Sequence, residues 1–236
     1  MIESINNEKI KQYSKLKDKK YRTEMSLFLV EGEHLVAEGV KQGVIKEIML
    51  LTGENSPYPS VTYVTKEVMK KLSNLTTPPK IIAVCHLLKP KPIIGNVLML
   101  DDISDPGNLG TIIRSAVAFN YETLIISPQT VDLYNSKVIR ASEGMLFNIN
   151  IIVSPLADII SVLKKDGYFI LGTDVKKGNL PSKLKQKHVL IIGSEARGIN
   201  HNLLSLCDEK LSLKMNQQCE SLNAAVAASI LMYELS

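Results

Sequence analysis

The stretch VLMLDDISDPGNLGTIIRSA, residues 97–116, decides the fold class because it joins an apolar run, a polar turn and a helical pattern. Val97–Leu100 has the continuous apolar character of a strand buried on both faces. Asp105, Pro106, Gly107 and Asn108 are typical turn residues, and the apolar spacing that follows predicts a helix over 111–119. A strand, turn and helix in this order indicate an α/β domain.

The remainder of the C-terminal half repeats this alternation. Short runs of Val, Ile and Leu are separated by segments long enough for helices, which predicts a parallel sheet covered on both faces. Ligands of such sheets bind at the carboxyl ends of the strands, so polar motifs after strands are the candidates for chemistry. The predicted strands are Thr123–Ile126, Ile149–Val153, Tyr168–Leu171 and Val189–Ile192.

Leu88–Pro92, a basic and proline-rich segment, is the best candidate for a linker. Before it, apolar runs alternate with helical spacing, which predicts a small α/β sandwich over residues 1–90 and a second domain over 95–236. The strands expected here are Leu27–Val30, Ile45–Leu51, Val61–Val64 and Ile81–His86, and the expected helices are Gly32–Gln42 and Lys66–Leu72.

Composition narrows the class of protein. Hydrophobic residues make up 45% of the chain and charged residues 22%, as in soluble globular proteins. We expect no membrane span and no signal peptide, because no apolar run is long enough and the N-terminus lacks a basic-then-apolar pattern. The odd number of cysteines favours inert thiols in the reducing cytoplasm. Scattered histidines and three cysteines without ligand spacing (Cys85, Cys207 and Cys219) disfavour a metal enzyme.

Positive charge is concentrated in the N-terminal half. Residues 1–100 carry 15 lysines and arginines against 10 acidic residues, whereas the remainder carries 13 against 14. The first segment holds a cluster that would attract phosphates at low sequence specificity, although a solvated helix face explains the same residues. This cluster comprises Lys9, Lys11, Lys15, Lys17, Lys19, Lys20 and Arg22.

Three motifs follow predicted strands. In the first, Asn108 lies in the turn and Arg114 in the helix, which suits an anion site or simply a turn with a solvent-facing arginine. In the second, Gly193-Ser-Glu-Ala-Arg-Gly198, Glu195 either binds a hydroxyl or caps the next helix. The third, 211–228, reads as a short strand, a polar loop and an alanine-rich helix with Asn223 in its first turns, either as a ligand contact or as a cap.

Taken together, these motifs resemble the three signature motifs of the SpoU (TrmH-like) RNA 2′-O-ribose methyltransferases, a family of the knotted SPOUT superfamily. The resemblance covers the chain from about Val97 to the end. Residues 17–33 resemble the start of the RNA substrate-binding domain that often precedes this catalytic domain. In the family, Pro commonly stands at the position of Lys214 and Gly at the position of Gln217, so this chain departs from the pattern there.

The resemblance implies a C-terminal parallel-sheet domain with a deep trefoil knot, a homodimer packed through that domain, and an active site drawn from both subunits. It implies S-adenosylmethionine as the cofactor and RNA as the partner. Cofactor contacts carried over by similarity are Thr173, Gly193, Gly198, Leu213, Met215 and Leu222; the catalytic positions are Asn108, Arg114, Glu195, Ser221 and Asn223.

The reaction expected from the resemblance is methyl transfer to a ribose 2′-hydroxyl of structured RNA, with 23S-type ribosomal RNA as the first choice. Arginine is protonated at ordinary pH, so we expect Arg114 to grip phosphate and stabilise the oxyanion rather than act as a base. The alternatives are a tRNA 2′-O-methyltransferase, a non-catalytic RNA-binding homologue, and a methyltransferase of bases or proteins. A dinucleotide-dependent dehydrogenase is disfavoured because no Gly-x-Gly-x-x-Gly occurs.

Overall fold

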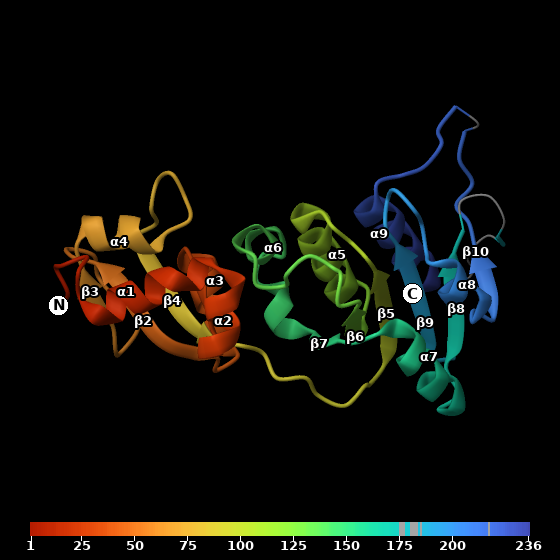
Figure 1. The fold of residues 1–236 in the computed structure, drawn as a ribbon, viewed down its shortest axis with the longest axis horizontal. Coiled ribbons are helices and arrows are strands. Elements are labelled where there is room, and N and C mark those ends of the chain that lie inside the picture. The colour runs from red at the N-terminus through yellow and green to blue at the C-terminus, as the bar shows by residue number, and fades with distance from the viewer. Residues whose placement is uncertain (175–177, 180–183, 185, 217) are drawn as a thin grey trace. The chain divides into compact units, whose positions relative to one another are not determined.

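The computed structural model describes residues 1–174, 178–179, 184, 186–216 and 218–236. The chain forms two compact units. The N-terminal unit comprises Met1–Leu88 together with Asp132–Phe147, and the C-terminal unit comprises Lys89–Val131 and Asn148–Ser236. Figure 1 shows the elements of each unit along the chain. The division into domains at 1–90 and 95–236 stays a prediction.

The N-terminal unit is built on a four-stranded sheet in the order β1-β4-β2-β3. Strand β4 is antiparallel to β1 and β2, whereas β2 and β3 are parallel. Its elements are α1 (Glu8–Ser14), the 3-10 helix η1 (Lys15–Lys17), α2 (Lys19–Met25), β1 (Leu27–Glu31), α3 (Glu33–Lys41), β2 (Ile45–Leu51), β3 (Thr62–Val64), α4 (Lys66–Leu72), β4 (Ile81–His86), α6 (Ser136–Ala141) and, at the end of the second segment, η2 (Met145–Asn148).

Arg22 is buried, which corrects its assignment to the basic surface. Its guanidinium donates to the backbone oxygens of Leu16 and Lys17, each at 2.8 Å, and pairs with Asp132 at 2.5 Å. Only 8% of Arg22 is exposed, so its charge is balanced by Asp132 and is not available to a partner. The partner lies 110 residues along the chain, which explains why local sequence gave no sign of the pairing.

The described residues of the C-terminal unit form one sheet of six strands in the order β10-β8-β9-β5-β6-β7, and every pairing in it is parallel. This confirms the predicted parallel sheet. The elements are β5 (Asn96–Asp101), α5 (Pro106–Ala118), β6 (Tyr121–Ile126), β7 (Asn150–Val153), α7 (Leu156–Lys165), β8 (Phe169–Thr173), β9 (His188–Gly193), α8 (His201–Ser205), β10 (Glu209–Leu211) and α9 (Ala224–Leu235).

Helices cover both faces of this sheet. Alternate strand residues such as Val97, Met99 and Ile191 pack with Ile160 of α7 and Leu203 of α8, while α5 and α9 pack against each other and against β6 and β9. Figure 1 shows α5 and α9 next to each other. Burial on both faces explains why these strands are continuous apolar runs rather than alternating ones.

Two helix starts differ from the sequence prediction. Helix α5 begins at Pro106 rather than Thr111, because the Asp105 side chain caps it by accepting the Asn108 N–H at 2.7 Å and Pro suits the first turn. The turn-like residues are therefore the first turn of the helix. Asn223 is the N-cap of α9 rather than a residue of its first turns. Among the described residues, no helix is long and apolar enough to cross a membrane.

His188 gives the C-terminal unit a dependence on pH. Its Nε2 lies 2.8 Å from the hydroxyl of Tyr121, and burial lowers the pKa of His188 below its ordinary value of 6.5. The unfolded chain therefore binds the proton more tightly, and the free energy of unfolding should fall as pH drops below 6.5 towards the folded-state pKa.

We predict that His188→Gln will reduce the loss of melting temperature between about pH 7 and about pH 5. The exposed His201 provides the control, and His201→Gln should keep the wild-type dependence. Thermal melts at both pH values measure the effect. An unchanged pH dependence in His188→Gln would contradict the assignment.

Candidate active site

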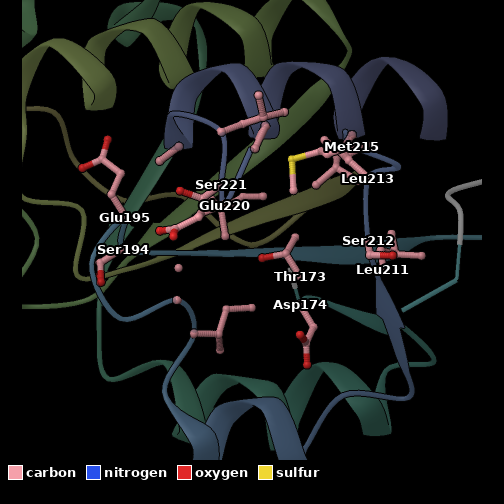
Figure 2. A pocket seen from close by; sticks show the side chains of 18 of the residues that line it. Thr173, Asp174, Ser194, Glu195, Leu211, Ser212, Leu213, Met215, Glu220 and Ser221 are labelled. Carbon is pink, nitrogen blue, oxygen red and sulfur yellow. The ribbon is translucent and has the colours of Figure 1, made fainter. Parts of the chain in front are cut away.

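A cavity of about 970 Å³ lies at the carboxyl end of the parallel sheet. Its walls come from the ends of β8 and β9, from the segments that follow β9 and β10, and from one side of α9. In Figure 2, Ser194 and Glu195 lie on one side, Leu213 and Met215 on the other, and Thr173, Glu220 and Ser221 between them. The site therefore occupies the sheet edge at which ligands of parallel α/β domains bind.

The loop after β9 folds back closely on its own strand. The Gly198 N–H donates to the Ser194 carbonyl at 2.8 Å, and the Arg197 N–H donates to the Ser194 hydroxyl at 3.3 Å. A β-carbon on Gly193 would lie 2.1 Å from the carbonyl carbon of Gly198. Only glycine at 193 is compatible with this return, and Gly198 adopts a positive φ of 67°.

Asp101 and Asp102 hold the far end of this loop, and sequence reasoning assigned neither a role. A carboxylate oxygen of Asp101 accepts the Asn200 N–H at 2.7 Å, and burial raises the pKa of Asp101. Asp102, at a φ of 59°, accepts from Ser127 Oγ at 2.8 Å and from Arg197 Nη2 at 3.3 Å. Two adjacent carboxylates at the end of a strand were the sequence feature that could have indicated that these residues hold a loop in place.

Three of the predicted catalytic side chains meet. Asn108 donates its side-chain amide to Glu195. The Asn223 amide donates to Asn108 Oδ1 at 3.0 Å and to Glu195 Oε1 at 3.4 Å. They come from α5, from the β9 loop and from the start of α9. The Glu195 carboxylate thus connects all three motifs through hydrogen bonds to two amides.

Asn223 has a second function that explains its position. Its Oδ1 caps α9 by accepting the N–H groups of Ala225 and Val226 at 3.0 and 3.3 Å. The same amide group therefore starts the helix with its oxygen and reaches the other motifs with its nitrogen. The cap fixes the side chain before any ligand binds, which favours a preorganised site.

Ser221 and Arg114 occupy different surroundings. Ser221 lines the cavity. Arg114 is exposed on α5, well beyond its first turns, lies outside the cavity lining, and has no hydrogen bond or ion pair to any described residue. Its guanidinium is therefore available to a ligand or to a second copy of the chain.

All six positions expected to contact the cofactor line the cavity: Thr173, Gly193, Gly198, Leu213, Met215 and Leu222. The lining fits S-adenosylmethionine, because apolar side chains suit an adenine ring and the carboxylates of Glu195 and Glu220 suit a sulfonium cation. Lys214 is exposed and is not part of the lining. Gln217 lies outside the described residues.

Comparisons with known proteins agree with this geometry. Residues 95–233 match the SpoU rRNA Methylase family, and residues 7–83 match an MRM3-like substrate binding domain. The chain is 36% identical to the 23S rRNA (guanosine(2553)-2′-O)-methyltransferase RlmP of Bacillus subtilis, with 99% of this chain and 98% of that protein covered.

Two solved structures that are similar to this chain contain the cofactor AdoMet. The SpoU methyltransferase AviRb from Streptomyces viridochromogenes, in complex with AdoMet, superposes with a TM-score of 0.84 at 26% identity over 97% of both chains. The AdoMet-bound rRNA methyltransferase from Sinorhizobium meliloti has a TM-score of 0.87 at 25% identity, with 99% of this chain and 97% of that chain covered. The chain belongs to the SpoU rRNA methylase family and is an S-adenosylmethionine-dependent RNA 2′-O-methyltransferase.

Proposed function

We propose that the chain methylates a ribose 2′-hydroxyl of 23S-type ribosomal RNA in the cytoplasm, at the nucleotide corresponding to guanosine 2553 in the name of the Bacillus subtilis relative. The observation that carries this proposal is the meeting of Asn108, Glu195 and Asn223 in the unit that holds the cofactor cavity. The likeness of residues 7–83 to a substrate binding domain supports RNA recognition by the N-terminal domain, residues 1–90. The catalytic domain is residues 95–236.

In this proposal, the cofactor supplies an electrophilic methyl group, and the protein prepares the hydroxyl. Thr173, Gly193, Gly198, Leu213, Met215 and Leu222 hold the cofactor. Asn108, Glu195, Ser221 and Asn223 orient the ribose and the loops, which matters because in-line transfer depends on position. Arg114 grips the neighbouring phosphate and stabilises the negative charge that develops on the 2′-oxygen while the hydroxyl proton passes to solvent.

We predict that Glu195→Ala will lower kcat by about a hundredfold, because two amides lose their common acceptor and the loops shift. Glu195→Gln keeps an oxygen that accepts from Asn108 and Asn223, so it should retain kcat within about tenfold of wild type. Single-turnover methylation of RNA with saturating cofactor measures both. Equal losses in the two variants would mean that the negative charge, and not the positioning, is the contribution of Glu195.

A homodimer built through the C-terminal domain is supported by an exposed apolar stripe on α9. Val226, Ile230 and Tyr233 are 48%, 38% and 64% exposed and recur at helical spacing on one face. Phe119, just after α5, contacts the Tyr233 ring with centroids 5.8 Å apart. Such a surface on a helix pair suits an isologous interface, and Arg114 on α5 would then be close to that interface.

The trefoil knot is part of the same proposal. Strand β10 is an edge strand beside β8, yet α9, which follows it, packs against α5 and β9 in the middle of the unit. The chain must therefore return across the carboxyl edge of the sheet between Leu211 and Ala224. A return of this kind, from an edge strand to the middle of the unit, is compatible with the knot expected of the family.

The basic surface of the N-terminal unit supports RNA binding. Lys15 and Lys20 are exposed, and their ammonium groups lie 5.2 and 5.8 Å from the centre of the Tyr21 ring. Contacts with the same ring keep the two charges close together on α1–η1–α2. Two adjacent ammonium groups suit consecutive phosphates.

We predict that replacing Lys15 and Lys20 together with alanine will weaken RNA binding and reduce the slope of log K against log salt by about 1.5, because two phosphate contacts are lost. The double variant of the exposed Lys46 and Lys70 changes the net charge equally and should leave the slope unchanged. Filter binding of transcribed 23S RNA over a range of salt concentrations measures it. Equal slopes in the two double variants would contradict the proposal that Lys15 and Lys20 contact RNA phosphates.

The proposed substrate is tested by incubating the protein with tritiated S-adenosylmethionine and, separately, with unmodified 23S RNA and tRNA. Label in a 2′-O-methylguanosine of 23S RNA alone is the expected result. Label only in tRNA would overturn the substrate. Label on a base would overturn the assigned site chemistry. Binding of the cofactor without label in either RNA would overturn both proposed substrates.

A further inference from the structure

The N-terminal unit contains a cavity of its own, with a volume of about 460 Å³. It lies where β1 and β2 end and β4 begins, beside the first turn of α3. All of its lining residues fall within the segment that matches a substrate binding domain. They are Glu33, His34, Ala37, Leu50, Glu54, Asn55, Pro57, Tyr58, Lys80 and Ile81.

Backbone hydrogen bonds preform this cavity. The Gly32 N–H donates to the Ile81 carbonyl at 3.0 Å, and the Leu51 N–H donates to the Lys80 carbonyl at 2.8 Å. In the loop that follows β2, Ser56 Oγ accepts the Tyr58 N–H and donates to the Tyr58 carbonyl, each at 3.0 Å. The position of Tyr58 is therefore fixed by its own backbone, which keeps the ordering cost of a bound ligand low.

The charges in the cavity do not suit a phosphate. Two carboxylates, Glu33 and Glu54, face a single ammonium group, and Lys80 is already paired with Glu54 at 3.1 Å. His34 lies 3.1 Å from the Glu143 carbonyl through its Nε2. The local balance is acidic, so the negative backbone of RNA would be repelled here.

The polar groups do suit a nucleobase. Tyr58 supplies an aromatic face, and half-buried aromatic rings are common stacking platforms for unpaired bases. The side chains of Glu33 and Asn55 have no hydrogen bond to any described residue, so their oxygens are free to accept base N–H groups. Adenine and cytosine present an exocyclic amino group to such acceptors, whereas uracil presents only one imino group between two carbonyls.

We propose that this cavity binds one unpaired nucleobase of the RNA substrate that carries an exocyclic amino group. Tyr58 stacks on the base, and Glu33 and Asn55 accept its N–H groups. The inference rests on RNA methylation and deepens it: the N-terminal unit reads a base at this cavity, whereas Lys15 and Lys20 contact phosphates without reading sequence.

Fluorescence tests the proposal directly, because the chain has no tryptophan. Tyr58→Trp places a reporter in the cavity, and Tyr63→Trp places a matched reporter at an exposed tyrosine of the same unit, outside the lining. The probes are single-stranded decamers of adenosine, cytidine or uridine, and transcribed 23S RNA. We expect saturable quenching of Tyr58→Trp alone, with uridine at least about fivefold weaker than adenosine.

Methylation kinetics provide a second readout. Tyr58→Ala should lower kcat/KM for 23S RNA about tenfold with kcat unchanged, because loss of one stacked base weakens binding. Tyr58→Phe keeps the aromatic face and should restore kcat/KM, and Tyr63→Ala should match wild type. Melting temperatures establish that each variant is folded.

Equal quenching of both tryptophans, no quenching at position 58 by RNA that is bound, or equal affinity for the uridine and adenosine decamers would overturn the base-binding cavity. Failure of the rRNA proposal has a different signature: wild-type protein would leave 23S RNA unlabelled, while the decamers would still quench Tyr58→Trp.

Discussion

Arg114→Ala and Glu195→Ala, each at about 1% of wild-type activity or less as a homodimer, should regain about half of the wild-type activity when one subunit of each is combined in a heterodimer. The proposed dimer explains why. If Arg114 of one subunit serves the site that holds Glu195 of the other, the heterodimer has one site with both residues intact. Its other site has neither.

The loss in the Arg114→Ala homodimer should be about a thousandfold in kcat, as expected when a preorganised charge opposite a developing oxyanion is removed. Arg114 is exposed on α5 and has no ion pair to any described residue, so its replacement should leave the melting temperature unchanged. Arg114→Lys keeps a positive charge but loses the planar fork that binds phosphate, and its activity should be intermediate.

Heterodimers are obtained by co-expressing the two variants with different affinity tags and purifying through both. The controls are the Arg114→Ala and Glu195→Ala homodimers, each purified through the same two tags, which should stay at or below about 1% of wild-type activity. A doubly tagged heterodimer with no more activity than the mean of these two controls would mean that Arg114 and Glu195 of one subunit serve the same site. A pH–rate profile of Arg114→Lys with a retained rate and a shifted limb would instead identify residue 114 as a base.

The sheet of the C-terminal unit was predictable because its strands are uninterrupted apolar runs. Each predicted strand there overlaps an observed one and differs by two residues or fewer at either end. Burial on both faces selects against polar residues at every strand position, so the pattern survives without any alignment. The end of β8 carries Thr173, and the end of β9 carries Gly193, so the strand positions also located the cavity.

Helices α1 and α2 were not predicted as elements, and the reason is local. Each has seven residues and begins at a side-chain cap, Asn7 and Asp18 respectively. Helices so short depend on packing rather than propensity, here through the buried Ile10 and Tyr13 of α1. The lysines that dominate this segment hid the few apolar positions that decide its fold.

The candidate site was predictable in its members but not in its connections. The three motifs predicted Asn108, Glu195 and Asn223 as site residues. The hydrogen bonds of Asn223, however, join it to Asn108, which is 115 residues away in the sequence, and to Glu195, which is 28 residues away. Asp101 was not recognised, because a carboxylate at a strand end has many roles and its partner is a backbone N–H at Asn200. Long-range pairings of this kind leave no periodic pattern.

Gly193→Ala should weaken S-adenosylmethionine binding by at least about a hundredfold, which corresponds to roughly 2.7 kcal/mol. The new β-carbon would lie 2.1 Å from the carbonyl carbon of Gly198 and 2.2 Å from the nitrogen of Ile199. Both neighbours are backbone atoms, so the clash cannot be relieved by a side-chain rotation. The loop that carries Glu195 must move away from the end of β9, and the cavity wall moves with it.

Gly167→Ala is the matched control for this prediction. Gly167 lies in the same unit at a φ of 80°, and the position that a β-carbon would take is open, so alanine there strains the backbone but meets no atom within 4 Å. It should cost about 1 kcal/mol of stability and leave cofactor binding unchanged. Isothermal titration calorimetry with both variants, after circular dichroism has established folding, separates the two effects. If Gly193→Ala bound the cofactor within about threefold of the wild-type affinity, the loop would tolerate displacement. The close packing of the Gly198 backbone against Gly193 would then not be required for cofactor binding.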